Sequence, residues 1–335
     1  MGSPRPTGAG LGLALLSAAT FGTSGTFARS LIDAGWSADA AVAARVGIAA
    51  LVIAVPAVLA LRGRWHVLSR SAGQIGLFGL LAVGGAQVGF FNAVRYLPVG
   101  VALLLEYSGI VLVVLWMWVR HGERPRGLTL AGAAVAVVGL ILVLNIAGGA
   151  TIDPVGLIWG LVAAVGLATY FIISSRVDPE LPSIALACGG MAFGAAVLLA
   201  LGVVGVLPMR ATFGTVEFAG HTMSWLAPVA GLSLIAAVIA YVTGIAAARL
   251  LGAALSSFAG LTEVLFAVLI AWLVLGELPT IMQGVGGTFI IAGIALVRLE
   301  QLRTTAAGPV PAGPDPAGPV PAGPGEPGEP VTAAR

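Results

Sequence analysis

Long runs of apolar residues, separated by short polar segments, fill most of the chain. A helix needs about 20 predominantly apolar residues to cross the hydrocarbon core of a bilayer, and the runs have this length. The pattern therefore predicts an all-α integral membrane protein with ten transmembrane helices. We expect these helices at residues 10–32, 37–61, 71–94, 97–119, 127–146, 154–175, 182–206, 223–247, 250–274 and 279–298.

The two halves of the chain resemble each other. Residues 95–143 match residues 249–297 in one register without a gap. The matching positions include Arg95 and Arg249, Leu97 and Leu251, Trp118 and Trp272, Gly122 and Gly276, Gly132 and Gly286, and Gly139 and Gly293. An offset of nearly half the chain is too long for a solenoid repeat, whose period is about 20–50 residues. It predicts two five-helix units, residues 10–146 and 154–298, as in many secondary transporters.

The arginines in the loops predict the orientation, because cytoplasmic loops of membrane proteins carry an excess of positive charge. One side of the predicted bundle has Arg62, Arg64, Arg70, Arg120, Arg124, Arg126, Arg176, Arg249, Arg298 and Arg303. The other side has only Arg29, Arg95 and Arg210. Both termini are therefore expected in the cytoplasm. Since each unit has an odd number of spans, the second unit should enter the membrane upside down, as an inverted repeat.

Composition supports a membrane protein and points to a source. The chain is 59% hydrophobic and 9% charged, whereas soluble domains carry roughly 25% charged residues. All 16 basic residues are arginine, which is typical of GC-rich bacterial genomes, and we expect the cytoplasmic (inner) membrane of a bacterium. Residues 304–335 are rich in Pro, Gly and Ala and are predicted to form a disordered cytoplasmic tail.

Two segments carry a family resemblance. They are GVALLLEYSGIVLVVLWMWVRHGERP at residues 100–125 and ARLLGAALSSFAGLTEVLFAVLIAWLVLGELPT at residues 248–280. Both resemble the EamA family of the drug/metabolite transporter superfamily, and the first is similar to the threonine/homoserine exporter branch. The resemblance covers about residues 10–300. It implies ten helices around a central cavity and the export of metabolites such as amino acids.

Three charged residues lie inside predicted spans: Arg45, Glu106 and Glu263. Each costs roughly 2.5–3.5 kcal/mol on insertion scales, so all three should face the bundle interior. In the functional interpretation, one glutamate couples transport to protons and Arg45 binds a substrate carboxylate. In the alternative interpretation, Arg45 and a glutamate form a static ion pair that holds helices together.

Further polar and aromatic residues are candidates for a substrate pocket. Gln87 and Asn92 would need hydrogen-bond partners in a dry setting, and Tyr107 neighbours Glu106. Trp159 and Tyr241 could stack on a ligand or simply pack against lipid and other helices.

Glu123 and Glu277 are matching positions of the repeat, and each follows a glycine at a predicted helix end. We interpret both as structural, because a carboxylate near the start of the following helix is favourable.

The sequence argues against enzymatic function and against nucleotide hydrolysis. The three histidines lie in predicted loops, and neither HExxH nor GxxxxGK[ST] occurs. We therefore expect no cofactor or metal, no nucleic-acid partner, and a small-molecule substrate. The prediction is a secondary transporter that exports an amino acid or a derivative, with proton coupling as a hypothesis. The alternatives are a transporter of sugars or drug-like compounds, and a non-transporting membrane scaffold or sensor.

Overall fold

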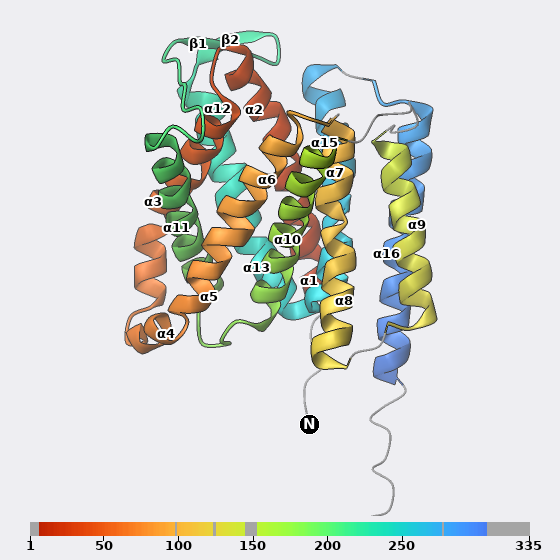
Figure 1. Ribbon diagram of the computed structural model, residues 1–335. Helices are drawn as coiled ribbons and strands as arrows, with labels where there is room; N and C mark the ends of the chain where they lie inside the picture. The colour runs from red at the N-terminus through yellow and green to blue at the C-terminus, as the bar shows by residue number, and fades with distance from the viewer. Residues whose placement is uncertain (1–6, 98, 123–124, 145–152, 277, 307–335) are drawn as a thin grey trace, which may run out of the picture.

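The protein is a bundle of long helices with one small hairpin at one end, as the computed structural model in Figure 1 shows. The structure describes residues 7–97, 99–122, 125–144, 153–276 and 278–306. The first half contains α1 (Thr7–Gly22), α2 (Ser24–Asp33), α3 (Ala38–Ala60), α4 (Trp65–Arg70), α5 (Ala72–Leu77), the π-helix η1 (Phe78–Gly85), α6 (Ala86–Ala93), α7 (Val99–Tyr107), α8 (Gly109–His121) and α9 (Gly127–Val143).

The second half also consists of long helices and contains a hairpin. It contains α10 (Pro154–Arg176), α11 (Ser183–Val203), β1 (Thr215–Phe218), β2 (His221–Ser224), α12 (Leu226–Ser233), the π-helix η2 (Leu234–Ile239), α13 (Ala240–Leu251), α14 (Ala253–Gly260), α15 (Thr262–Leu275) and α16 (Ile281–Ala306). The two strands pair antiparallel, with Phe218 opposite His221.

Nine helical stretches within the described residues are long and apolar enough to cross a membrane, so the chain is a multi-pass membrane protein. The prediction of ten spans is supported for nine of them. The predicted span 127–146 is present as α9, which has 17 residues and is shorter than the others. Residues 145–152, which follow it, lie outside the described part of the chain, as do Glu123 and Glu277.

Two boundaries differ from the prediction. The span predicted to begin at residue 223 begins at Leu226, because residues 221–224 form strand β2. The helix predicted to end at residue 298 continues to Ala306, so the first residues of the predicted tail are helical. This extension is held by Glu300, whose carboxylate pairs with Arg126 and accepts a hydrogen bond from Leu128 N at 3.3 Å.

Several spans are interrupted near the middle of the bundle. The first span changes from α1 to α2 at Thr23, the fourth from α7 to α8 at Ser108, and the ninth from α14 to α15 at Leu261. The π-helices η1 and η2 interrupt the third and eighth spans, and such π turns often occur at functional sites. The apolar pattern of the sequence did not indicate these interruptions.

Helices of the two halves pack against each other in reciprocal pairs. The first span of each half packs on the third span of the other half, α1 on α13 and α10 on α6. The second spans, α3 and α11, pack on each other, and so do the last spans, α9 and α16. The α9–α16 pair lies at one edge of the bundle (Figure 1).

Glycines set the distance between α9 and α16. A Cβ atom on Gly132 would lie 2.7 Å from the carbonyl oxygen of Gly293, and one on Gly139 would lie 2.6 Å from that of Gly286. Gly132 matches Gly286 and Gly139 matches Gly293 in the sequence repeat. Replacing each glycine of one contact by its matching residue therefore gives the other contact. Small residues allow this close approach of membrane helices.

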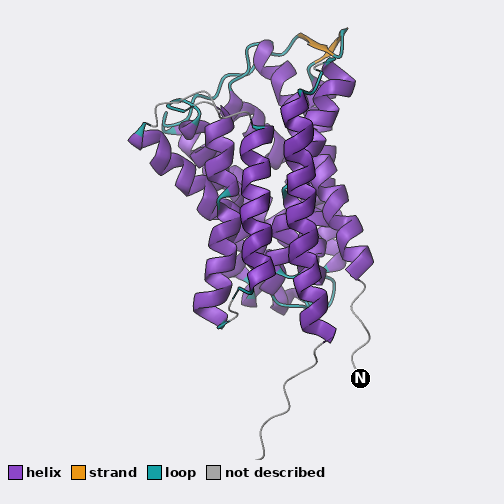
Figure 2. Ribbon diagram, turned by 90° about the vertical axis from the view of Figure 1, so that its right-hand side faces the viewer, coloured by secondary structure: helices purple, strands orange, loops and turns teal. Residues whose placement is uncertain are grey.

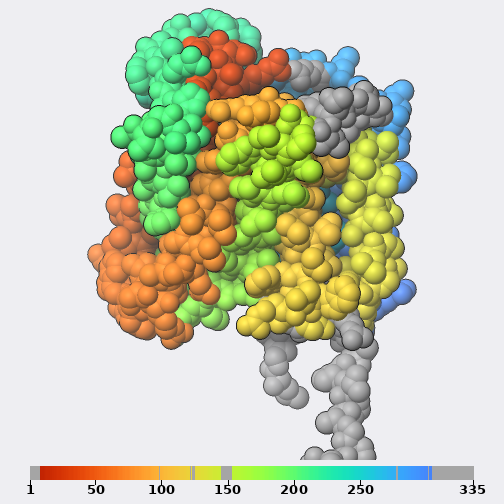
Figure 3. Space-filling model, viewed as in Figure 1, coloured from red at the N-terminus to blue at the C-terminus, as the bar shows by residue number. Residues whose placement is uncertain are grey.

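The two ends of the bundle differ. One end, which we call the hairpin end, carries β1–β2 and the α2–α3 turn (Figures 1 and 2). There Trp36 Nε1 donates to Thr212 O at 2.7 Å, and the Trp36 ring packs on Phe213 and Trp225. The opposite end, which we call the α4 end, carries α4 and the start of α1, and Figure 3 shows the hairpin and α4 at opposite ends in a space-filling view.

Candidate functional site

A cavity of about 730 Å³ lies in the middle of the bundle and is lined by residues of both halves. It reaches the hairpin end, where Arg29, Ile32, Ala38 and Val99 belong to its walls. Ile32 and Val99 are 42% and 58% exposed, so this end of the cavity is open.

The α4 end is closed. Tyr170 and Tyr241 line the cavity and pack with Phe78, and the Tyr170 ring centroid is 5.7 Å from each of the other two. Beyond them are the buried residues Ile173 and Ile245. The cavity is therefore separated from the α4 end by packed side chains.

Ion pairs and hydrogen bonds connect the helices at the α4 end. Arg70, at the end of α4, forms an ion pair with Asp178, and the backbone N–H of Glu180 donates to the same carboxylate at 2.9 Å. Arg249, at the end of α13, donates through Nη1 to Leu181 O at 2.6 Å. These contacts join α4 and α13 to the turn between α10 and α11.

Arg45 lies on α3 in the wall of the cavity and is 7% exposed. Its Nη2 donates to Ala236 O at 2.5 Å, and its guanidinium lies 5.6 Å from the centroid of the Phe21 ring. Ala236 belongs to the π-helix η2, and such turns often occur at functional sites. The π-helix thus supplies the acceptor that positions Arg45.

Arg45 has no carboxylate within ion-pair distance among the described residues. Its Nε is buried and has no hydrogen-bond partner in that part of the chain. Glu106 and Glu263 act on it electrostatically without a direct contact. The static Arg45–glutamate ion pair, one of the two interpretations of the sequence, is absent from this conformation.

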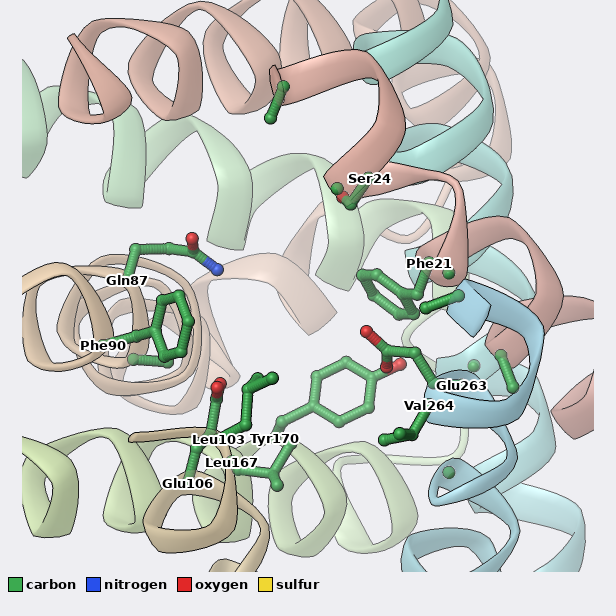
Figure 4. Close-up of a pocket in the computed structure, with 18 of the residues that line it drawn as sticks. Phe21, Ser24, Gln87, Phe90, Leu103, Glu106, Leu167, Tyr170, Glu263 and Val264 are labelled. Atoms are coloured by element: carbon green, nitrogen blue, oxygen red, sulfur yellow. The ribbon is translucent and has the colours of Figure 1, made fainter. Parts of the chain in front are cut away.

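The two carboxylates come from the two halves of the chain. Glu106 lies on α7, two residues before the interruption at Ser108, and Glu263 lies on α15, two residues after the interruption at Leu261. Both line the cavity, and Figure 4 shows their carboxyl groups on opposite sides of the open space. The Tyr107 hydroxyl interacts with the Glu263 carboxylate. The interruptions of the fourth and ninth spans thus lie beside the charged groups of the cavity.

Of the other predicted pocket residues, Gln87, Tyr107 and Tyr241 line the cavity. Asn92 and Trp159 are not among its lining residues. The Asn92 side chain donates to Val88 O of its own helix at 2.8 Å, which gives one of its N–H groups a partner without a ligand.

Aromatic residues that the sequence did not single out form much of the wall. Phe21, Phe90, Phe91 and Phe171 line the cavity, and so does Tyr170. In a chain this apolar, a phenylalanine that faces a cavity has the same sequence signal as one that faces lipid. Of these residues, only Tyr170 could have been suspected of lining a cavity, because its hydroxyl group needs either open space or a hydrogen-bond partner.

The comparisons with known proteins agree with this architecture. Residues 8–145 and 154–299 match the EamA-like transporter family. The chain is 30% identical over 240 residues to a protein named probable terminal-alkyne amino-acid exporter from Streptantibioticus cattleyicolor, a match that covers 70% of this chain and 75% of that protein. It is 26% identical over 226 residues to an uncharacterized transporter of Clostridium kluyveri, covering 66% of this chain and 70% of the other.

A solved crystal structure has the same fold, with a TM-score of 0.71 and 19% sequence identity, and the match covers 89% of this chain and 99% of that one. The two family matches together span most of the sequence, and both fall on the helical units described above. The chain is a membrane protein that belongs to the EamA-like transporter family.

Proposed function

We propose that this protein is a secondary transporter that exports an amino acid or an amino-acid derivative through alternating access of the central cavity. The observation that carries the proposal is the charge pattern of the cavity wall. One guanidinium without a carboxylate partner and two carboxylates without a cationic partner face the same space, among the described residues. A zwitterion supplies the missing partner for each sign of charge, which neither a sugar nor a neutral drug-like compound does.

Burial makes this pattern costly without a ligand. Charged groups inside a membrane protein mark substrate or ion pathways, because each one costs roughly 2.5–3.5 kcal/mol to insert. A scaffold or sensor has no use for three such charges around a cavity of about 730 Å³. The name of the Streptantibioticus relative, an amino-acid exporter, supports the same substrate class.

We also propose that the two halves are inverted repeats of five spans each. The reciprocal packing of α1 on α13 and α10 on α6 supports this, as does the exchange of matching glycines between α9 and α16. Gly122 and Gly276 are matching residues, and each ends its helix with a positive φ, 69° and 72°. Antiparallel contacts between matching helices are expected from a two-fold axis in the membrane plane.

The loop arginines support a cytoplasmic α4 end and cytoplasmic termini, in a bacterial inner membrane. With this orientation, the cavity opens to the outside and is closed toward the cytoplasm. The conformation is then outward-open, with the substrate site exposed after release.

A binding experiment tests the proposed function. We expect one or more apolar amino acids to raise the thermal unfolding temperature of the purified protein, since a ligand at 100 times its Kd stabilises the native state by about 2.7 kcal/mol. The same compounds should exchange across proteoliposomes, with protein-free liposomes as the control. Stabilisation and exchange by sugars or neutral compounds, with none by amino acids, would contradict the proposal.

The orientation is tested with single cysteines in a variant that lacks the native Cys188. Ser69→Cys at the α4 end and Ala211→Cys near the hairpin occupy exposed positions. In intact cells, a membrane-impermeant maleimide should label residue 211 and leave residue 69 unlabelled until the membrane is opened. The reverse pattern would overturn the proposed orientation.

A further inference from the structure

The contacts at the start of α1 and α10 extend the repeat register to the first span of each half. A Cβ atom on Gly10 would lie 2.8 Å from Leu251 Cδ2, and one on Gly156 would lie 2.6 Å from Leu97 Cγ. Leu97 and Leu251 are matching residues, so Gly10 matches Gly156. Counting along both helices, the following pairs also match: Ser24 and Tyr170, Gly25 and Phe171, Ala28 and Ser174.

The second half of α10 seals the α4 end. It packs against α13 and α14. There Phe171 fits onto Gly260, where an added Cβ would lie 2.9 Å from Phe171 Cζ. Ser174, one turn farther along α10, is fully buried.

The matching segment, α2, does not make the matching contact. Matching partners for α2 would be α6 and α7, but within the described residues α2 packs on α12, α15 and β1 instead. The cavity occupies the space between, with Arg29 and Ile32 on the α2 side and Phe90 and Val99 on the other. The first span is interrupted at Thr23, between α1 and α2, whereas α10 runs without interruption. This interruption separates α2 from α1, and α2 packs away from α6 and α7.

We infer that α2 is the outer gate of the cavity and that it closes by straightening at Thr23, so that Gly25 packs on Glu106. The inference rests on the proposed alternating access and inverted repeat. Glu106 matches Gly260, so the closed outer contact, Gly25 on Glu106, corresponds to the closed inner contact, Phe171 on Gly260. The large and small partners are exchanged: the inner seal places a ring over a glycine, and the outer seal places a glycine over a carboxylate. Gly25 leaves the space that the Glu106 side chain requires.

Closure of α2 also changes the surroundings of Glu106. The carboxylate, now open to the cavity, would be covered, and a buried charge without a partner is strongly unfavourable. Arg45 and Glu263 are the charged groups that act on Glu106 from the neighbouring helices, and they have opposite signs. The gate is therefore expected to close when a cation, either a proton or the ammonium group of a substrate, neutralises Glu106.

Gly25 offers a selective test, because in this conformation nothing described lies within 4 Å of a Cβ atom added to it. The variants Gly25→Ala and Gly25→Leu should fold, and because Gly25 lines the cavity, their effect on the gates is measured by labelling and not by transport. Gly12→Leu is the matched control, since Gly12 lies on the same span and also has no atom within 4 Å. Two single-cysteine variants report accessibility in the background without Cys188. They are Ala28→Cys on α2, in the outer gate, and Ser174→Cys at the matching position of α10, in the seal of the α4 end.

We expect Gly25→Leu to hold the outer gate open. Labelling of residue 28 from the hairpin side should be retained, and labelling of residue 174 from the α4 side should slow by about tenfold, which corresponds to ~1.4 kcal/mol. Gly25→Ala should have a smaller effect, and Gly12→Leu none. Gly260→Leu should act in the opposite direction, because its side chain would displace Phe171 and open the inner seal.

The outcomes separate the gate from the proposed function. If residue 174 is labelled equally fast in the Gly25→Leu and parent proteins, α2 is not the outer gate, although alternating access stands. If residue 174 is never labelled in the parent protein or in Gly260→Leu, alternating access itself is wrong and the gate with it.

Discussion

Arg45→Lys is expected to fold normally and to lose most of its transport activity. Lysine keeps the charge but lacks the planar fork that binds a carboxylate through two parallel hydrogen bonds. Arg45→Ala should lose more, because truncating one partner of a buried charge pair costs ~2–5 kcal/mol, or roughly 30-fold to several thousand-fold in binding. Uptake or exchange of the best amino-acid ligand in proteoliposomes measures both effects, and Arg62→Ala, in the exposed turn before α4, is the matched control.

The double variant Arg45→Ala with Glu106→Gln separates a substrate ligand from an internal brace. It removes a cation and an anion together, so the charge balance of the cavity is kept. We expect this protein to be stable and inactive. Recovery of transport in the double variant would show that Arg45 balances Glu106 and does not bind the substrate.

Glu106→Gln is expected to abolish the response of transport to a proton gradient while substrate exchange continues. A gradient of one pH unit is worth about 1.4 kcal/mol per proton, which can hold about a tenfold difference in substrate concentration. With the acidic side at the hairpin end, the parent protein should accumulate substrate there, and the variant should only equilibrate it. Because α2 closes on Glu106 in the proposed gate, we expect Glu263→Gln to have the smaller effect.

The measurement is substrate accumulation in oriented proteoliposomes at equal and unequal pH. Glu217→Gln is the control, since Glu217 lies in the exposed strand β1. Full gradient-driven accumulation by both Glu106→Gln and Glu263→Gln would reject proton coupling through these carboxylates and leave them with a structural role.

The candidate site could be predicted only in part. Arg45, Glu106 and Glu263 were recognisable as candidates because they are charged residues inside apolar spans. Inserting a charge into the membrane costs free energy, so such residues usually have a function. Gln87, Tyr107 and Tyr241 were found by the same argument in weaker form, and all three line the cavity. Asn92 and Trp159 were also predicted but do not line the cavity. Asn92 donates a hydrogen bond within its own helix, and the sequence does not reveal this local contact.

The sequence by itself determined that the chain crosses the membrane and, to within a few residues, where nine of its spans lie. These properties depend on the length of each apolar run, which can be read directly from the sequence. The tertiary structure decided which faces of the helices line the cavity, where the spans are interrupted and which end is open. Phe21 and Phe171 show why. An aromatic side chain has the same low cost against lipid, against another helix and against a cavity, so only the packing of distant helices assigns its place.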